Sequence, residues 1–130
     1  MSAEFMTVHN TELPSEVRVT VDAWRRGINE NDLDLIASCF SSHALFQGLR
    51  PEPLFGPEGV KEYYGQQPQP LTVEYEVVHY RELSPSAGVA YLRAAFSPAG
   101  RERLTTHVTL VLEHQHGRWL ISHYHVSVVP

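Results

Sequence analysis

Residues 103–129 read RLTTHVTLVLEHQHGRWLISHYHVSVV, and this stretch decides the fold class. Valine, leucine and threonine dominate it, as is typical of β-strands. The pair His116-Gly117 interrupts the stretch with a turn signal. We therefore expect two antiparallel strands, residues 103–114 and 118–129, joined by a short hairpin turn.

Two similar stretches precede this hairpin. Residues 71–82 and 88–97 are also rich in valine, leucine, tyrosine and threonine. Ser84-Pro85-Ser86 and Pro98-Ala99-Gly100 separate the stretches with turn-forming residues. Four strands joined by short loops predict an antiparallel meander.

The first half of the chain shows helical spacing instead. Val17, Val21, Trp24 and Ile28 recur at intervals of three and four from a start near Ser15. A second short helix is expected to carry Leu33, Ile36 and Phe40, and a third to span residues 58–65. Helices followed by a curved sheet predict an α+β fold, with residues 1–13 as a flexible arm and residues 14–130 as one domain.

Composition narrows the classes of function. The chain has 130 residues and a net charge of −5, so we expect no nucleic-acid partner. No apolar run is long enough for a membrane helix, and the first residues carry no apolar signal-peptide core. Cys39 is the single cysteine. These features favour a cytoplasmic protein without a membrane association, and we predict no cofactor.

Eight histidines are many for this length, and five of them follow residue 100. Alternation along the last two predicted strands places the even-numbered, mostly apolar side chains in the core. The odd-numbered positions mix aromatic, apolar and histidine side chains, which favours a buried contact with another copy of the chain. The predicted interface of a homodimer, or of an assembly of dimers, consists of His107, Thr109, Trp119, Ile121, His123 and His125.

A metal site is the alternative for these histidines. His123 and His125 lie on one strand face and could supply two imidazole ligands, with His107 and Glu113 as further candidates. However, no HExxH or CxxC motif accompanies the pair. We therefore favour the interface and predict no metal site.

Several motifs carry a resemblance to a known superfamily. Ala90-Tyr91-Leu92-Arg93 is similar to an Ala-Tyr-Ile-Arg motif, and residues 123–127, HYHVS, are similar to His-Phe-His-Arg-Ser. Both motifs belong to the association domain of calcium/calmodulin-dependent protein kinase II. The chain resembles that family most within the NTF2-like superfamily, which also includes the SnoaL-like polyketide cyclases and the ketosteroid isomerases. The resemblance implies a cone in which N-terminal helices pack on a strongly curved, mainly antiparallel sheet.

The resemblance also implies a ligand pocket inside the cone. In the association domain, the arginine of the Tyr-x-Arg motif lines this pocket, which points to Arg93 here. Val126 and Leu110 stand where that family has two further arginines, so the pocket is expected to be more apolar. We expect a small organic anion bound by Arg93. The predicted ligand-binding residues are Arg93, Tyr91, Tyr64, Phe46, Tyr124 and Val126.

Two functions remain open from the sequence. The first is binding of a small molecule, with lyase, isomerase or cyclase chemistry on an organic acid or a polyketide-like compound as its catalytic form. The second is a non-catalytic association module. All three aspartates, Asp22, Asp32 and Asp34, fall in the first two predicted helices, which leaves no evident carboxylate base inside the cone.

Overall fold

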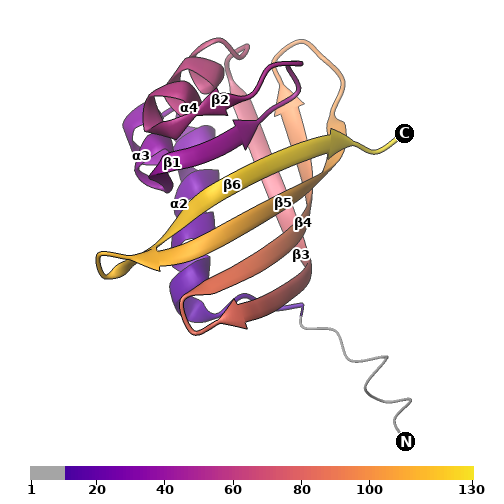
Figure 1. Ribbon diagram of the computed structural model, residues 1–130. Helices are drawn as coiled ribbons and strands as arrows, with labels where there is room; N and C mark the ends of the chain where they lie inside the picture. Colours follow the sequence, from indigo (N-terminus) through magenta and orange to yellow (C-terminus); the bar gives the residue numbers. More distant parts are fainter. Residues whose placement is uncertain (1–10) are drawn as a thin grey trace, which may run out of the picture.

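The computed structural model describes residues 11–130 and confirms the α+β class (Figure 1). Within residues 11–130, three helices and six strands follow in the order that the sequence predicts, and the first half also holds strands β1 and β2. Phe40, which was expected on the second helix, begins β1 instead. The elements are α2 (Ser15–Glu30), α3 (Leu33–Ser38), β1 (Phe40–Gln47), β2 (Leu54–Phe55), α4 (Gly56–Gly65), β3 (Leu71–Ser84), β4 (Ala87–Pro98), β5 (Leu104–Gln115) and β6 (Arg118–Val128).

The six strands form one sheet in the order β2-β1-β6-β5-β4-β3. Neighbouring strands are antiparallel except for β1 and β6, which run parallel. The sheet curves around α2, while α3 and α4 lie beside β1 at one end (Figure 1). The result is the cone expected from the sequence. We call the sheet face toward α2 the inner face and the opposite one the outer face.

The helix α2 is amphipathic and fills the cone. Its predicted apolar positions, Val17, Val21, Trp24 and Ile28, are all buried. Asn31 ends the helix in the left-handed conformation, with φ of 54°. The Oδ1 atom of Asp32 then accepts a hydrogen bond from the Leu35 amide at 3.1 Å and caps α3.

The expected N-terminal arm is only partly described. Residues 1–10 lie outside the described residues, and Leu13, within the expected arm, is buried in the core. Leu13 therefore belongs to the packed core rather than to a loose arm. Among the helices of residues 11–130, none is long and apolar enough to cross a membrane.

A β-bulge divides β6 and changes which side chains face the core. Val111 lies opposite His123, but Leu112 lies opposite Ile121, so Ser122 is an extra residue in β6. Because of this extra residue, Ile121 points to the inner face and is fully buried. The prediction that Ile121 lies on the outer face is therefore wrong.

The same bulge reverses Trp119. This side chain packs against the core, and its Nε1 atom donates a hydrogen bond to Glu16 of α2 at 3.2 Å. The Trp119 carbonyl also accepts a hydrogen bond from Thr20 Oγ1 at 2.6 Å. Trp119 thus joins β6 to α2, and its predicted place on the outer face is wrong.

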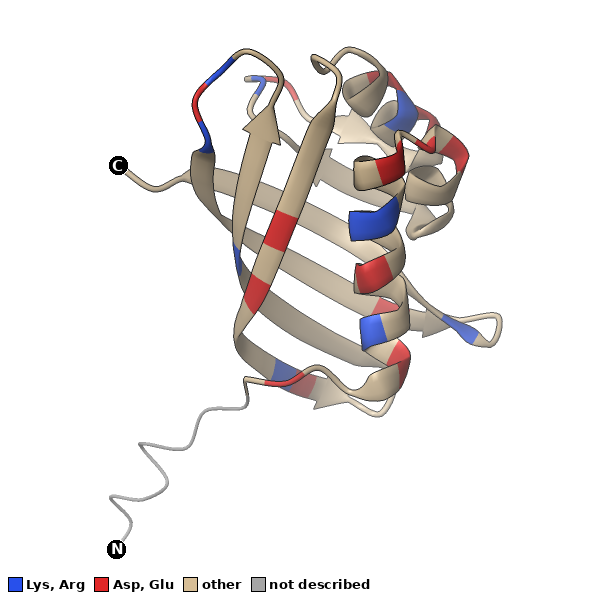
Figure 2. Cartoon of the chain, turned by 180° about the vertical axis from the view of Figure 1, so that it is seen from behind, with Lys and Arg blue, Asp and Glu red and all other residues tan. Residues whose placement is uncertain are grey.

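The long edge strand β3 lies along α2. Asn29 accepts a hydrogen bond from the Val73 amide at 2.8 Å, and its Nδ2 atom donates one to the Val73 carbonyl at 3.4 Å. Charged residues of both signs occur along α2, and acidic residues occur on β3 beside it (Figure 2). Glu74 of β3 forms an ion pair with Arg25 at 3.4 Å.

Candidate ligand-binding site

A small cavity opens at one end of the cone, where β3 and β5 begin and β4 and β6 end. Its volume is about 60 Å³. This is smaller than typical ligand pockets of roughly 300–1,000 Å³, so it would enclose only part of a ligand. The lining residues are Leu49, Tyr63, Tyr64, Gln67, Leu71, Phe96, Pro98, Leu104, Tyr124 and Val126.

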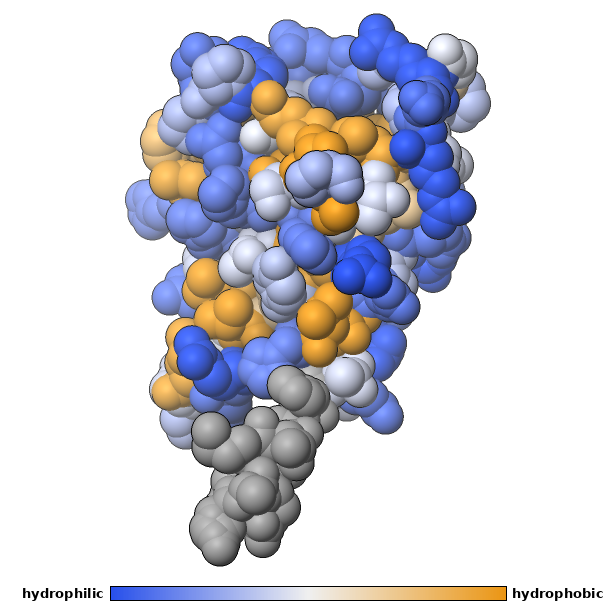
Figure 3. All heavy atoms as spheres, turned by 90° about the vertical axis from the view of Figure 1, so that its right-hand side faces the viewer, coloured by the Kyte–Doolittle hydropathy of each residue, from blue (hydrophilic) through white to orange (hydrophobic). Residues whose placement is uncertain are grey.

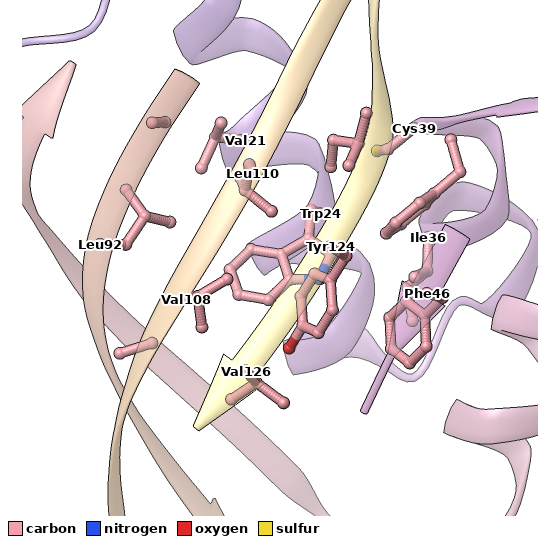
Figure 4. Close-up of a cluster of buried hydrophobic side chains, with 14 of the residues drawn as sticks. Val21, Trp24, Ile36, Cys39, Phe46, Leu92, Val108, Leu110, Tyr124 and Val126 are labelled. Carbon is pink, nitrogen blue, oxygen red and sulfur yellow. The ribbon is translucent and has the colours of Figure 1, made fainter. Parts of the chain in front are cut away.

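Aromatic rings form the wall behind this cavity. Phe46 of β1 stacks on Tyr124 of β6, with ring centroids 4.3 Å apart and ring planes 12° apart. Trp24 lies on the other side of Tyr124, at a centroid distance of 6.1 Å (Figure 4). Tyr64 packs edge-on against Phe46 at 5.6 Å. Such packed aromatic rings hold the cavity wall in a fixed position.

Three polar groups meet at the base of the cavity. The indole Nε1 atom of Trp24 donates a hydrogen bond to the Tyr64 hydroxyl at 3.1 Å. The hydroxyls of Tyr64 and Tyr124 lie near enough for each to affect the pKa of the other. Burial raises the pKa of Tyr64 and of Tyr124 well above the ordinary value for tyrosine. Both hydroxyls therefore remain protonated and can act as hydrogen-bond donors.

Tyr63 closes another part of the wall. Its hydroxyl accepts a hydrogen bond from the Leu49 amide at 3.3 Å. A Cβ atom on Gly48 would lie 2.4 Å from the Tyr63 ring, so only glycine allows the chain to pass this close. Burial is also the main cause that raises the pKa of Tyr63.

Arg93 does not lie in the cone. It is on the outer face, its side chain is 53% exposed, and its Nη1 atom lies 3.6 Å from Glu76 Oε1. Tyr91 lies on the same outer face. The alternate residues of β4, Ala90, Leu92 and Ala94, are buried and therefore face inward. The prediction that Arg93 and Tyr91 lie in the cone pocket is therefore wrong. Arg93 is not in a position to bind the expected anion inside the cone.

The remaining predicted pocket residues are brought together. Tyr64, Tyr124 and Val126 line the cavity, and Phe46 lies directly behind Tyr124. No Asp, Glu, His, Lys or Arg side chain within residues 11–130 contributes to the lining. The cavity is thus apolar, with tyrosine hydroxyls and the Gln67 amide as its polar groups.

A match to a known family profile identifies the family to which this chain belongs. Residues 17–130 match the sequence profile of the SnoaL-like domain. The chain belongs to the SnoaL-like family. No curated protein sequence matches it.

Solved structures share the fold of this SnoaL-like domain at low sequence identity. A Nostoc punctiforme domain of unknown function with a cystatin-like fold is 15% identical, with a TM-score of 0.79 over 89% of this chain and 76% of that one. A Xanthomonas campestris protein described as a calcium/calmodulin-dependent protein kinase II association domain is 17% identical, with a TM-score of 0.76 over 95% and 96%. A ketosteroid isomerase-like protein from Erwinia carotovora is 12% identical, with a TM-score of 0.76 over 89% and 95%.

The other predicted interface residues of this SnoaL-like domain do lie on the outer face. His107 is half-buried and stacks on Tyr91, with ring centroids 5.1 Å apart. Thr109 and His123 are half-buried, and His125 is exposed. Whether a second chain covers these side chains stays a prediction.

The sequence reasoning missed most of the cavity lining. Leu104 and Leu71 begin two strands, while Phe96 and Pro98 end a third. In an antiparallel meander, the start of one strand lies beside the end of the next, so these residues meet at one end of the sheet. Phe96, Leu104 and Tyr124 are even-numbered, and the even-numbered strand positions are those predicted to face the core. Leu49 and Gln67 lie in loops, where no such periodic signal exists.

Proposed function

We propose that this SnoaL-like domain binds a small, uncharged and largely apolar molecule at the open end of its cone. The observation that supports this most is the cavity lining, which combines aliphatic and aromatic side chains with tyrosine hydroxyls and no charged group among residues 11–130. Binding sites for small molecules typically have apolar walls with a few polar groups that orient the ligand.

The lining favours binding over proton-transfer catalysis. General acid–base catalysis needs a group that gains and loses a proton near neutral pH. Burial raises the pKa of both cavity tyrosines, Tyr64 and Tyr124, further above that range. Cys39, the single thiol, is buried in the core, and burial raises its pKa to about 11, which disfavours a nucleophilic thiolate.

Blocking the cavity mouth tests this proposal. Leu104→Trp adds an indole at the mouth, and we expect it to reduce binding of acetophenone, a small aromatic ketone, by at least about tenfold through loss of space. Binding can be measured from NMR shifts of the Trp24 indole N–H, which lies at the base of the cavity.

Two variants serve as controls for this change. Glu102→Trp places the same indole on an exposed loop two residues away, and Arg93→Ala removes the arginine on the outer face. Both should bind acetophenone as the unchanged protein does. Equal loss in Glu102→Trp, or undiminished binding in Leu104→Trp, would contradict the proposal.

Self-association through the outer face is the second candidate. None of the helices in the described part of the chain packs on this face, because α2 and α4 contact the inner side and the end of the sheet. Its half-buried side chains include Leu45, Tyr91 and Val111. Seen from the right-hand side of Figure 1, the surface of the molecule has apolar patches among polar ones (Figure 3). Such mixed surfaces occur in specific protein interfaces.

The mass in solution tests the second candidate directly. We expect sedimentation or light scattering at micromolar concentration to give a multiple of the 14.7 kDa chain mass. A mass equal to one chain would contradict association, and it would leave the binding proposal intact because cavity and outer face lie on opposite sides of the sheet.

A further inference from the structure

A second hollow lies between helix α2 and the hairpin that joins β5 to β6 (Figure 1). Its volume is about 360 Å³, which falls within the range of roughly 300–1,000 Å³ that is typical of ligand sites. None of residues 11–130 lines both this hollow and the cone cavity. We call it the hairpin groove, and its lining includes Glu16, Val19 and Ala23 of α2 and Arg118 and Trp119 of β6.

Both sides of the hairpin groove present apolar side chains. Val19 and Ala23 are four residues apart on α2, so they lie on the same side of the helix. Val19 is 70% exposed, more than any other large apolar side chain in residues 11–130. Trp119, on the β6 side, is half-buried. A flat apolar molecule between these side chains would remove apolar surface from water, which is favourable.

Three contacts hold Trp119 in place at the groove. Its Nε1 atom donates a hydrogen bond to Glu16 at 3.2 Å, and its carbonyl accepts one from Thr20 Oγ1 at 2.6 Å. The ring of His114 packs edge-on against the indole, with centroids 5.4 Å apart. Because the indole is already ordered, a ligand that packs on it pays little entropy for fixing this side chain.

The end of the groove near Cys39 is positively charged. Arg118 donates one hydrogen bond, from Nη2 to the Ser38 carbonyl at 3.1 Å, and forms no ion pair with a carboxylate of residues 11–130. Burial is the main cause that raises the pKa of the Cys39 thiol, and the charges of Arg118 and Arg26 partly oppose it. A guanidinium group has five donor hydrogens, so Arg118 keeps several for a ligand.

The negative charge of the groove lies elsewhere. Glu16 is the one carboxylate among the described lining residues, and it accepts the hydrogen bond of the Trp119 indole. Glu16 and Arg26 are ten residues apart in α2, which corresponds to about 15 Å along the helix axis. An anionic group is therefore favoured near Arg118 and disfavoured near Glu16.

We propose that the hairpin groove binds a small aromatic carboxylate, with its ring between Val19 and Trp119 and its carboxylate paired with Arg118. A planar guanidinium can hold a carboxylate with two parallel hydrogen bonds, which gives this contact a defined direction. The site is separate from the cone cavity, and it does not depend on the function proposed for that cavity.

Three probes with the same ring system separate the possible preferences. 1-Naphthylacetate carries a negative charge, 1-naphthylacetamide is neutral, and 2-(1-naphthyl)ethylamine carries a positive charge. Each is titrated into the whole chain and followed by NMR at the indole N–H signals. The chain has two tryptophans, so Trp119 reports on the groove and Trp24 reports on the base of the cone cavity.

We expect naphthylacetate to shift the Trp119 signal and to bind about fivefold more tightly than the amide, with the amine weakest. In Arg118→Gln, the preference for the carboxylate over the amide should fall to about one, while the affinity for the amide stays unchanged. Arg101→Gln is the matched control, because it makes the same change in net charge at an exposed residue of the loop between β4 and β5. This control should keep the preference.

The opposite outcomes would overturn this inference. These are equal affinity for carboxylate and amide, tighter binding of the amine, a preference that survives Arg118→Gln, or a preference that disappears in Arg101→Gln. Shifts of the Trp24 signal alone would also overturn it, because the ring would then bind only in the cone, as the proposed function allows. No shift of the Trp119 signal with any probe, up to its solubility limit, would overturn it as well.

Discussion

The inner and outer faces of the sheet differ sharply although they are built from alternate residues of the same strands. In β1, Phe46 is fully buried within the aromatic wall, whereas the preceding Leu45 is half-buried on the outer face. In β4, Leu92 is fully buried and the next residue, Arg93, is mostly exposed. Strand alternation thus assigns each residue to the cavity side or to the outer side, and chemical character follows that assignment.

The largest expected difference is between two adjacent substitutions in β1. Phe46→Ala removes a ring that contacts Tyr124, Tyr64 and Phe40, so we expect it to lower the free energy of unfolding by about 3–5 kcal/mol. Leu45→Ala, on the outer face, should cost only about 1 kcal/mol, because its side chain is already partly exposed.

Urea denaturation followed by circular dichroism measures both changes. We expect the Phe46 variant to be half-unfolded at a much lower urea concentration, while its free energy of unfolding depends on urea as steeply as before. Similar midpoints for the two variants would show that the outer face contributes as much to folding as the inner one. That result would point to Leu45 as part of a buried contact between chains.

A somewhat smaller difference is expected between two single-residue deletions in β6. Deleting Ser122 removes the extra residue of the bulge and leaves Ile121 opposite Leu112, so stability should change by about 1 kcal/mol or less. Deleting Leu120 while the hairpin turn is kept moves Ser122 to the position opposite Leu112 and Ile121 to the outer face. The loss of this buried side chain should cost about 2–5 kcal/mol.

The same denaturation measurement distinguishes the two deletions. If deletion of Ser122 were as damaging as deletion of Leu120, the bulge would have a role beyond setting which face each side chain occupies.

Much of the fold could be predicted because its signals are periodic. The spacing of Val17, Val21, Trp24 and Ile28 identifies α2, and the parity of Leu110, Leu112 and Tyr124 identifies the core face. Trp119 and Ile121 were misassigned because a bulge shifts the alternation by one residue, and Ser122 carries no sequence mark of its own.

Arg93 was misplaced for a different reason. Its role came from a short motif shared with another family, whereas the alternation of Ala90, Leu92 and Ala94 within β4 already places it on the outer face. At low identity, a shared fold does not preserve the role of a single side chain. The tyrosines of the cavity were found more reliably, because Tyr64 and Tyr124 occupy positions that helix and strand periodicity direct inward.

The contact between Asn29 and Val73 has a consequence for solubility. An exposed edge strand offers free amide and carbonyl groups to which a strand of another molecule can add, and such additions can continue into aggregates. The carboxamide of Asn29 occupies both backbone groups of Val73, on the side of β3 that faces away from β4. The helix that fills the cone therefore also closes part of the sheet edge to unwanted strand addition.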